Sequence, residues 1–179
     1  MTEASLPKRL EASRLAADEQ SISGTITVTE QVFERFQQAV EAVVAPVEFV
    51  LNFYRDPEGH SVLEGTLKTQ VEMTCQRCLG SATIELDGDF QLGLAYSDEK
   101  AKHLPKAYEP ALMDEKGNVD PWELIEDELI LALPMFANHP EGECKMAQLP
   151  SEPEQTISET DSDSEKENPF AVLASLKKQ

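Results

Sequence analysis

The chain has 179 residues and a formal net charge of −19, with 34 acidic residues against 15 basic ones. This length suits one compact domain with a tail rather than two ordinary domains. A surface this acidic repels phosphate backbones, which disfavours broad direct binding of nucleic acid and makes basic proteins the more natural partners. The three cysteines come without a secretory signal and without a run of about 20 apolar residues that would span a bilayer. We therefore expect a cytoplasmic protein that makes no use of a membrane.

The first regular elements are expected between residues 21 and 46. Residues 21–29 alternate Ile and Val with Thr and Ser, which predicts a strand. A helix is expected directly after it, capped by Thr29 and extending to about residue 43, before Pro46 prevents its continuation. The apolar residues of this helix recur at helical spacing and form one buried stripe: Val32, Phe33, Phe36, Ala39 and Val40.

The middle of the chain predicts an antiparallel sheet. Residues 47–54 form a strand, the turn at 56–59 contains Pro and Gly, and residues 61–74 alternate apolar and polar side chains. After a short turn, residues 81–97 resume extended character. The predicted fold class is therefore α+β, an antiparallel sheet with packed helices.

The part of the chain that follows predicts a surface segment and then a helix. Residues 97–119 are charged and contain prolines, which favours a long surface excursion. Asp120 as N-cap, Pro121 at the first helical position and Glu123 then predict the start of a helix that continues to about Leu133. The acids on its first turns are expected to be solvated and to favour the helix dipole.

Four residues offer the ligands for one metal ion. Cys75 and Cys78 are separated by two residues, so a tight turn can place both thiolates on one ion, and His139 and Cys144 lie together after the last predicted helix. We expect one structural zinc held by these four side chains, which would leave no open coordination position. The alternatives are reduced thiols without metal and, with less support, a redox pair.

The end of the chain changes composition twice. Residues 1–146 are predicted to form the single domain, and residues 147–167 a disordered acidic linker, since they contain few apolar groups. Residues 168–179 predict a short amphipathic segment, for which docking to another protein and packing on its own domain are both open. The residues proposed for docking are Asn168, Pro169, Phe170, Val172, Leu173 and Leu176.

Four segments of the sequence resemble the YceD family of bacterial large ribosomal RNA subunit accumulation proteins. They are VEMTCQRCLG at 71–80, LPKAYEP at 104–110, WELIEDELILALP at 122–134 and NPFAVLASLK at 168–177. The resemblance implies an accessory role in the synthesis, processing or stability of large-subunit (23S) ribosomal RNA. Ribosome-assembly proteins or basic ribosomal proteins are the implied partners, with direct or indirect contact to that RNA. Some relatives carry a further cysteine pair where this chain has His139 and Cys144.

Other function classes are distinguished by particular sequence features. An acidic protein-binding adaptor outside ribosome assembly would have the same charge. A direct RNA-binding protein would need a basic strip, for which one loose grouping exists: Lys68, Arg77, Lys100, Lys102 and Lys106. An enzyme and a small-molecule substrate are not expected, because the sequence contains no nucleophile elbow, zinc-protease motif, phosphate-binding loop or dinucleotide fingerprint.

Overall fold

The computed structural model describes residues 6–29, 32–140 and 142–144. Its helices are α1 (Ala12–Ala17), α2 (Glu34–Ala39), α3 (Asp98–Ala101) and α4 (Pro121–Leu131). Its strands are β1 (Ser21–Ile26), β2 (Ala42–Val43), β3 (Val47–Arg55), β4 (Ser61–Thr74), β5 (Ser81–Ala95) and β6 (Glu109–Leu112). The described residues belong to one compact unit, while the predicted segments 147–167 and 168–179 lie outside the described residues.

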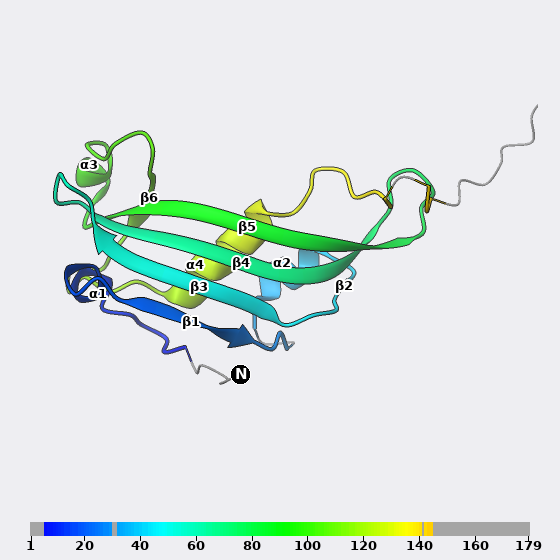
Figure 1. The fold of residues 1–179 in the computed structure, drawn as a ribbon, viewed down its shortest axis with the longest axis horizontal. Coiled ribbons are helices and arrows are strands. Elements are labelled where there is room, and N and C mark those ends of the chain that lie inside the picture. The colour runs from blue at the N-terminus through cyan, green and yellow to red at the C-terminus, as the bar shows by residue number, and fades with distance from the viewer. Residues whose placement is uncertain (1–5, 30–31, 141, 145–179) are drawn as a thin grey trace, which may run out of the picture. The chain divides into compact units, whose positions relative to one another are not determined.

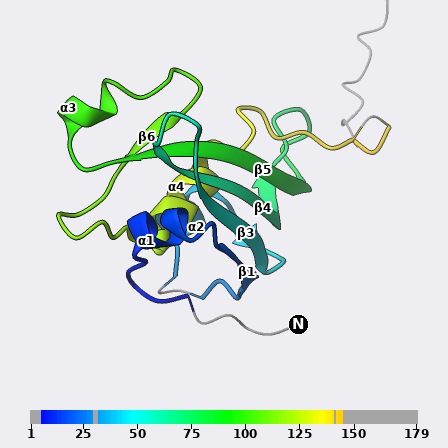
Figure 2. The ribbon, with the colours of Figure 1, turned by 60° about the vertical axis from the view of Figure 1, so that its left-hand side comes forward.

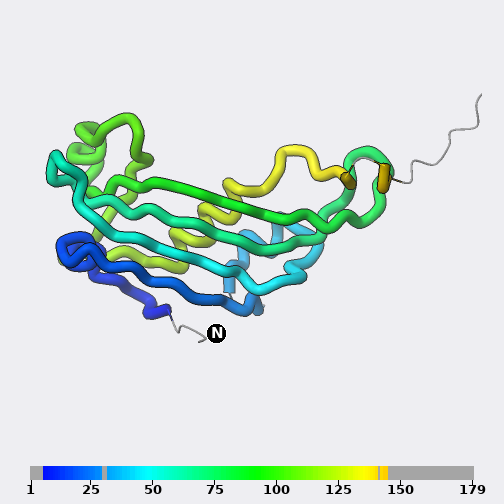
Figure 3. The backbone as a smooth tube through the Cα atoms, in the orientation of Figure 1, coloured from blue at the N-terminus to red at the C-terminus, as the bar shows by residue number. Residues whose placement is uncertain are grey.

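The strands form one sheet in the order β1-β3-β4-β5-β6, and β2 pairs with the far end of β4 (Figure 1). All pairs are antiparallel except β5 with β6, which is parallel. The longest pair is β4 with β5, whose register continues from Ser61↔Leu94 to Thr74↔Ser81. This long hairpin is visible in the backbone trace, with the CxxC turn at its tip (Figure 3). The α+β class is confirmed.

One face of the sheet is buried beneath α1, α2 and α4 (Figure 2). Alternate residues of β3, among them Phe49, Leu51 and Phe53, point into this core, and Ile125 and Leu129 of α4 are buried in the same core. The C-terminal end of α4 comes close to the sheet at Gly88, where an added Cβ would lie 3.4 Å from the Cβ of Ala132, the C-cap of the helix. The opposite face carries exposed polar side chains, as expected for an antiparallel sheet with one solvated face.

The main strands and the last helix agree with the sequence. The predicted strands at 47–54, 61–74 and 81–97 correspond to β3, β4 and β5, and the strand at 21–29 corresponds to β1, which ends at Ile26. Asp120 caps α4 as expected, since its Oδ1 accepts hydrogen bonds from the backbone N–H groups of Trp122 (2.9 Å) and Glu123 (3.3 Å).

The predicted helix over 30–43 is wrong at both ends. Helix α2 is short, and its N-cap is Phe33 in the left-handed conformation (φ 59°) rather than Thr29. Residues 42–43 form β2 instead, where Val43 pairs with Val71 of β4. Tertiary pairing therefore overrides the local helical pattern at its C-terminal end.

The predicted surface excursion at 97–119 contains two regular elements. Helix α3 begins where Ser97 accepts a hydrogen bond from the N–H of Lys100. Strand β6 joins the edge of the sheet in parallel with β5, and Ala111 of this strand is buried. The sequence does not predict this strand, because its proline and its charged residue are typical of loops. An edge strand tolerates both. Helix α1 was not predicted either.

None of the helices in the described ranges is long and apolar enough to cross a membrane.

Candidate metal centre

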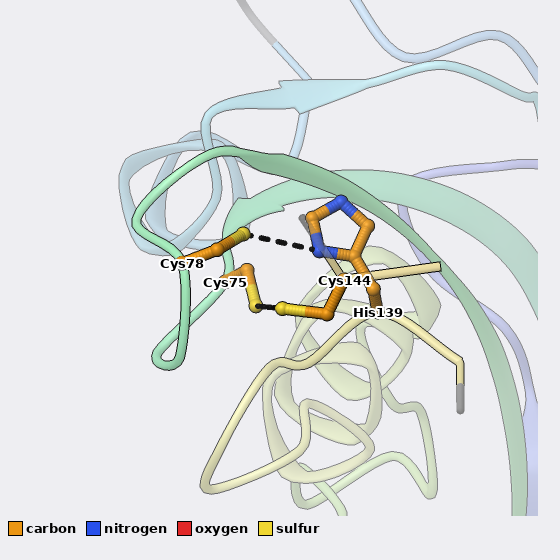
Figure 4. A group of neighbouring side chains, drawn as sticks. All are labelled: Cys75, Cys78, His139 and Cys144. Atoms are coloured by element: carbon orange, nitrogen blue, oxygen red, sulfur yellow. Dashed lines mark hydrogen bonds between the residues drawn. The ribbon is translucent and has the colours of Figure 1, made fainter. Parts of the chain in front are cut away.

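The four predicted ligands lie together at the tip of the β4–β5 hairpin (Figure 4). Cys75 directly follows β4 and Cys78 lies in the turn, whereas His139 and Cys144 come from the segment after α4. Cys75 is buried and the other three side chains are half-buried. Residues more than 60 positions apart are therefore brought into one cluster.

Backbone hydrogen bonds build the cysteine turn and attach the second segment to it. The N–H of Cys75 donates to the carbonyl of Gly80 (2.8 Å), and the N–H of Leu79 donates to the carbonyl of Cys75 (2.9 Å). Leu79 has a φ of 59°, which allows this tight reversal. The N–H of Gln76 donates to the carbonyl of Ala137 (2.8 Å), so the two segments are joined two residues before His139.

The distances within the cluster suit a tetrahedral ion. The ligand atoms all lie within 4.8 Å of one another. The Sγ atoms of Cys75 and Cys144 are 4.0 Å apart, and the Sγ of Cys78 is 3.4 Å from Nδ1 of His139. A tetrahedral zinc with Zn–S of about 2.3 Å and Zn–N of about 2.0 Å places neighbouring ligand atoms roughly 3.5–3.8 Å apart. The three cysteines are free thiols. The arrangement therefore has the size and the donor atoms of a structural zinc site.

His139 is oriented by a hydrogen bond from its second ring nitrogen. Its Nε2 lies 2.9 Å from the carbonyl oxygen of Ser81, an acceptor that requires the proton to be on Nε2. Nδ1 of the neutral ring then presents its lone pair to the cluster. A carbonyl at the outer nitrogen is a common second partner of a metal-binding histidine, because it sets both the tautomer and the ring orientation.

The environment favours the thiolate of Cys75. Backbone N–H groups, first that of Cys78 and then those of Arg77 and His139, lower its pKa to about 5 despite burial. The pKa of Cys78 is raised: the backbone N–H of Gly80 favours its thiolate, but burial and the neighbouring sulfurs of Cys144 and Cys75 outweigh it. Three thiols this close cannot all ionise easily without a cation among them.

Arg77 contributes a positive charge next to the cluster. The pKa of its guanidinium is raised, chiefly by the side chain of Cys144. Three thiolates and a neutral imidazole around Zn²⁺ would leave one net negative charge, which the Arg77 guanidinium would offset. Neither this role nor that of the Ser81 carbonyl has a signal in the sequence, because both depend on contacts across the hairpin tip.

The loose basic grouping does not form one strip. Lys68 lies on the solvated face of β4 and pairs with Asp87 (2.9 Å), while Arg77 lies at the cysteine cluster. Lys100 belongs to α3 and lies over the ring of Tyr96 (5.2 Å). The cluster and α3 are at opposite ends of β5 (Figure 1), which has 15 residues and thus separates them by roughly 45 Å.

A second group of possible ligands is explained by a turn. The possible ligand atoms of Asp56, Glu58 and His60, in the turn between β3 and β4, all lie within 4.8 Å of one another. Oδ1 of Asp56 accepts hydrogen bonds from the N–H groups of Glu58 (3.0 Å) and His60 (2.8 Å), and Oδ2 lies 2.9 Å from Nδ1 of His60. These bonds stabilise the turn and occupy the carboxylate, so the cysteine cluster is the better candidate for a metal.

The fold and the cluster define an α+β protein with a thiol–imidazole centre at the end of a long hairpin. Residues 63–177 match the family model described as large ribosomal RNA subunit accumulation protein YceD. The protein of that name from Haemophilus influenzae is 35% identical over 145 residues, which cover 80% of this chain and 81% of the relative. The chain belongs to the YceD family, and the role in large-subunit ribosomal RNA accumulation expected from the resemblance is confirmed at the level of the family. No solved structure is significantly similar to the chain.

The predicted docking residues lie outside the described residues. Asn168, Pro169, Phe170, Val172, Leu173 and Leu176 fall in the last part of the chain, most of it within the range matched by the family model. Their role stays a prediction.

Proposed function

We propose that the protein is an accessory factor of ribosome biogenesis that supports the accumulation of large-subunit ribosomal RNA without catalysing a reaction. The observation that carries this proposal is the family match over residues 63–177. Its partners are ribosome-assembly proteins or basic ribosomal proteins, because a chain with a net charge of −19 attracts basic surfaces. Its place of action is the cytoplasm, where those partners and the RNA meet.

The cysteine cluster has a structural part in this function. Cys75, Cys78, His139 and Cys144 hold one zinc ion that joins the hairpin tip to the segment after α4. Support comes from the mutual distances of the four ligand atoms and from the carbonyl partner of His139. Four protein ligands leave no coordination position for a substrate, so the ion stabilises the tip rather than performing chemistry.

The function is tested by deleting the gene and measuring the ratio of large-subunit to small-subunit ribosomal RNA. We expect a selective fall in the large-subunit RNA that a plasmid copy of the wild-type gene restores. An unchanged ratio, or a fall in both RNAs alike, would contradict the proposed role.

The zinc site is tested by metal analysis of protein purified without a histidine tag. We expect about one zinc per chain and its loss in Cys75→Ser and His139→Ala. His60→Ala is the matched control, since it removes a histidine from the turn cluster and should leave the zinc content unchanged. Folded wild-type protein without metal would rule out the site.

A further inference from the structure

A groove lies between the edge strand β6 and helix α4. It has a volume of about 390 Å³. The buried residues Leu92, Ala111 and Val119 form its apolar base. Its remaining lining residues are Glu109, Pro110, Leu112, Asp120, Glu123, Leu124, Asp127, Glu128 and Leu131.

The walls of this β6–α4 groove are acidic and contain no basic residue. Asp120 caps α4, and Asp127 pairs with Arg35 of α2 (2.8 Å). Glu109, Glu123 and Glu128, by contrast, form no ion pair with any described residue. Glu123 and Glu128 are five residues apart on α4 and therefore lie about 140° apart around its axis, at the two edges of the helix surface that lines the groove. Glu128 is the one whose pKa is affected by the charge of Glu109 of β6.

The ionised form of Glu128 is destabilised by its surroundings in the groove. It is partly buried, and this burial, together with the charges of Glu109 and Asp127, raises its pKa to about 7. A nearby cation stabilises the ionised form of a carboxylate in such surroundings.

Two leucines add an apolar contribution at the groove. Leu112 of β6 is 54% exposed and Leu131 at the end of α4 is 68% exposed. Exposed leucines beside uncompensated carboxylates match a ligand that offers both apolar and cationic side chains.

We propose that the β6–α4 groove binds a basic segment of a large-subunit ribosomal protein, a refinement that rests on the proposed function. Lys or Arg side chains of this segment meet Glu109, Glu123 and Glu128, and its apolar side chains pack on Leu112 and Leu131. Charge complementarity selects this partner over RNA, because the same carboxylates repel phosphate groups.

The test uses the full chain, immobilised, and RNA-free proteins extracted from purified large ribosomal subunits, with retained proteins identified by mass spectrometry. The groove variant is Glu109→Gln/Glu123→Gln/Glu128→Gln, which removes three charges with nearly isosteric side chains. The matched control is Glu48→Gln/Glu64→Gln/Glu85→Gln, which removes three charges from the solvated face of the sheet. Circular dichroism verifies that both variants are folded, and Leu112→Ser/Leu131→Ser tests the apolar contribution separately.

We expect the wild type and the sheet-face control to retain the same basic ribosomal proteins, and the groove variant to retain them at least about tenfold more weakly. Equal weakening in both triple variants would mean that net charge alone attracts the proteins, and no weakening would mean that they bind elsewhere. Either result overturns the proposal. In a separate experiment, purified ribosomal RNA is offered to the immobilised protein, and retention of this RNA in place of the ribosomal proteins would also overturn the proposal.

Rescue of the deletion strain separates this proposal from the proposed function. If the wild-type gene restores large-subunit RNA and the groove variant does so equally well, the groove proposal fails alone. If the deletion leaves the RNA ratio unchanged, the proposed function fails whatever the binding result. We expect rescue by the wild type and the sheet-face control, and reduced rescue by the groove variant.

Discussion

At the scale of single residues, the surroundings of a side chain matter more than its type. Glu123, Glu126 and Glu128 belong to one helix and were all expected to be solvated acids, yet the structure gives them different surroundings. Glu126 accepts hydrogen bonds from α2, Glu123 is exposed, and Glu128 is partly buried near two other carboxylates. The expectation of a uniformly solvated acidic cluster is therefore wrong for Glu126 and Glu128.

Glu128 makes the stability of the fold depend on pH. Its pKa is raised to about 7 in the folded protein, above the value of about 4.3 expected in the unfolded chain. The folded state therefore binds the proton more tightly, and stability falls as the pH rises from about 4.3 through 7. We expect Glu128→Gln to remove this fall and to stabilise the protein at pH 8 by up to about 1 kcal/mol, a value reduced by partial solvent screening. The gain should vanish near pH 4.

Urea unfolding at several pH values measures this effect. Glu64→Gln, on the solvated sheet face, corrects for the general loss of one negative charge. A gain for Glu128→Gln that is the same at pH 4 and pH 8 would contradict the assigned cause.

At the scale of elements, α2 shows how tertiary contacts define a short helix. Glu126 of α4 accepts hydrogen bonds from the backbone N–H groups of Arg35 (2.7 Å) and Phe36 (3.2 Å), in the first turn of α2. The Arg35 side chain also bonds the same carboxylate (Nη2 at 2.8 Å). These contacts satisfy N–H groups that no residue of α2 itself caps.

Glu126→Ala should therefore lower the free energy of unfolding by about 2 kcal/mol, because it leaves backbone donors without their charged acceptor. Asp127→Ala is the control: the only ion pair that Asp127 forms with a described residue is to the exposed guanidinium of Arg35, so its loss should change stability little. Chemical denaturation of both variants makes the comparison. Equal effects would show that the contact with the arginine, and not the bonds to the α2 backbone, is what matters.

At the scale of the whole molecule, the acidic chain combines a core domain with a terminal segment for which the sequence predicts docking. A helix of fewer than about 12 residues is marginal by itself and needs a surface to pack on. For residues 168–179, a partner and the chain's own domain are both open as that surface, and we propose the partner.

Deletion of residues 168–179 should leave the melting temperature unchanged and reduce rescue of large-subunit RNA in the deletion strain. Phe170→Ser/Leu173→Ser should act in the same way, because it removes the apolar side chains without shortening the chain. A lower melting temperature in both variants would instead support the alternative that the segment packs on its own domain. Full rescue by both variants would remove the docking role.

The local patterns of the sequence determined the main strands, the cap of α4 and the cysteine turn. These features depend on interactions between residues that are close in the sequence, so a local pattern predicts them. Examples are the alternation of apolar residues in β3 and β4, the Asp120–Pro121 start of α4 and the spacing of Cys75 and Cys78. The structure places His139 and Cys144 next to the pair, as the predicted ligand set requires, while their role as ligands stays a prediction. The sequence could indicate this proximity because it contains few other cysteines and histidines.

Only the tertiary structure decided the parallel pairing of β6, the limits of α2 and the surroundings of the ligands. The carbonyl of Ser81 reaches His139 from 58 positions away, and Glu126 reaches Arg35 from 91 positions away. The β6–α4 groove likewise arises where an edge strand and a helix leave a gap beside the core. These features depend on packing between segments distant in the sequence, and no local periodicity encodes which distant partner a residue will meet.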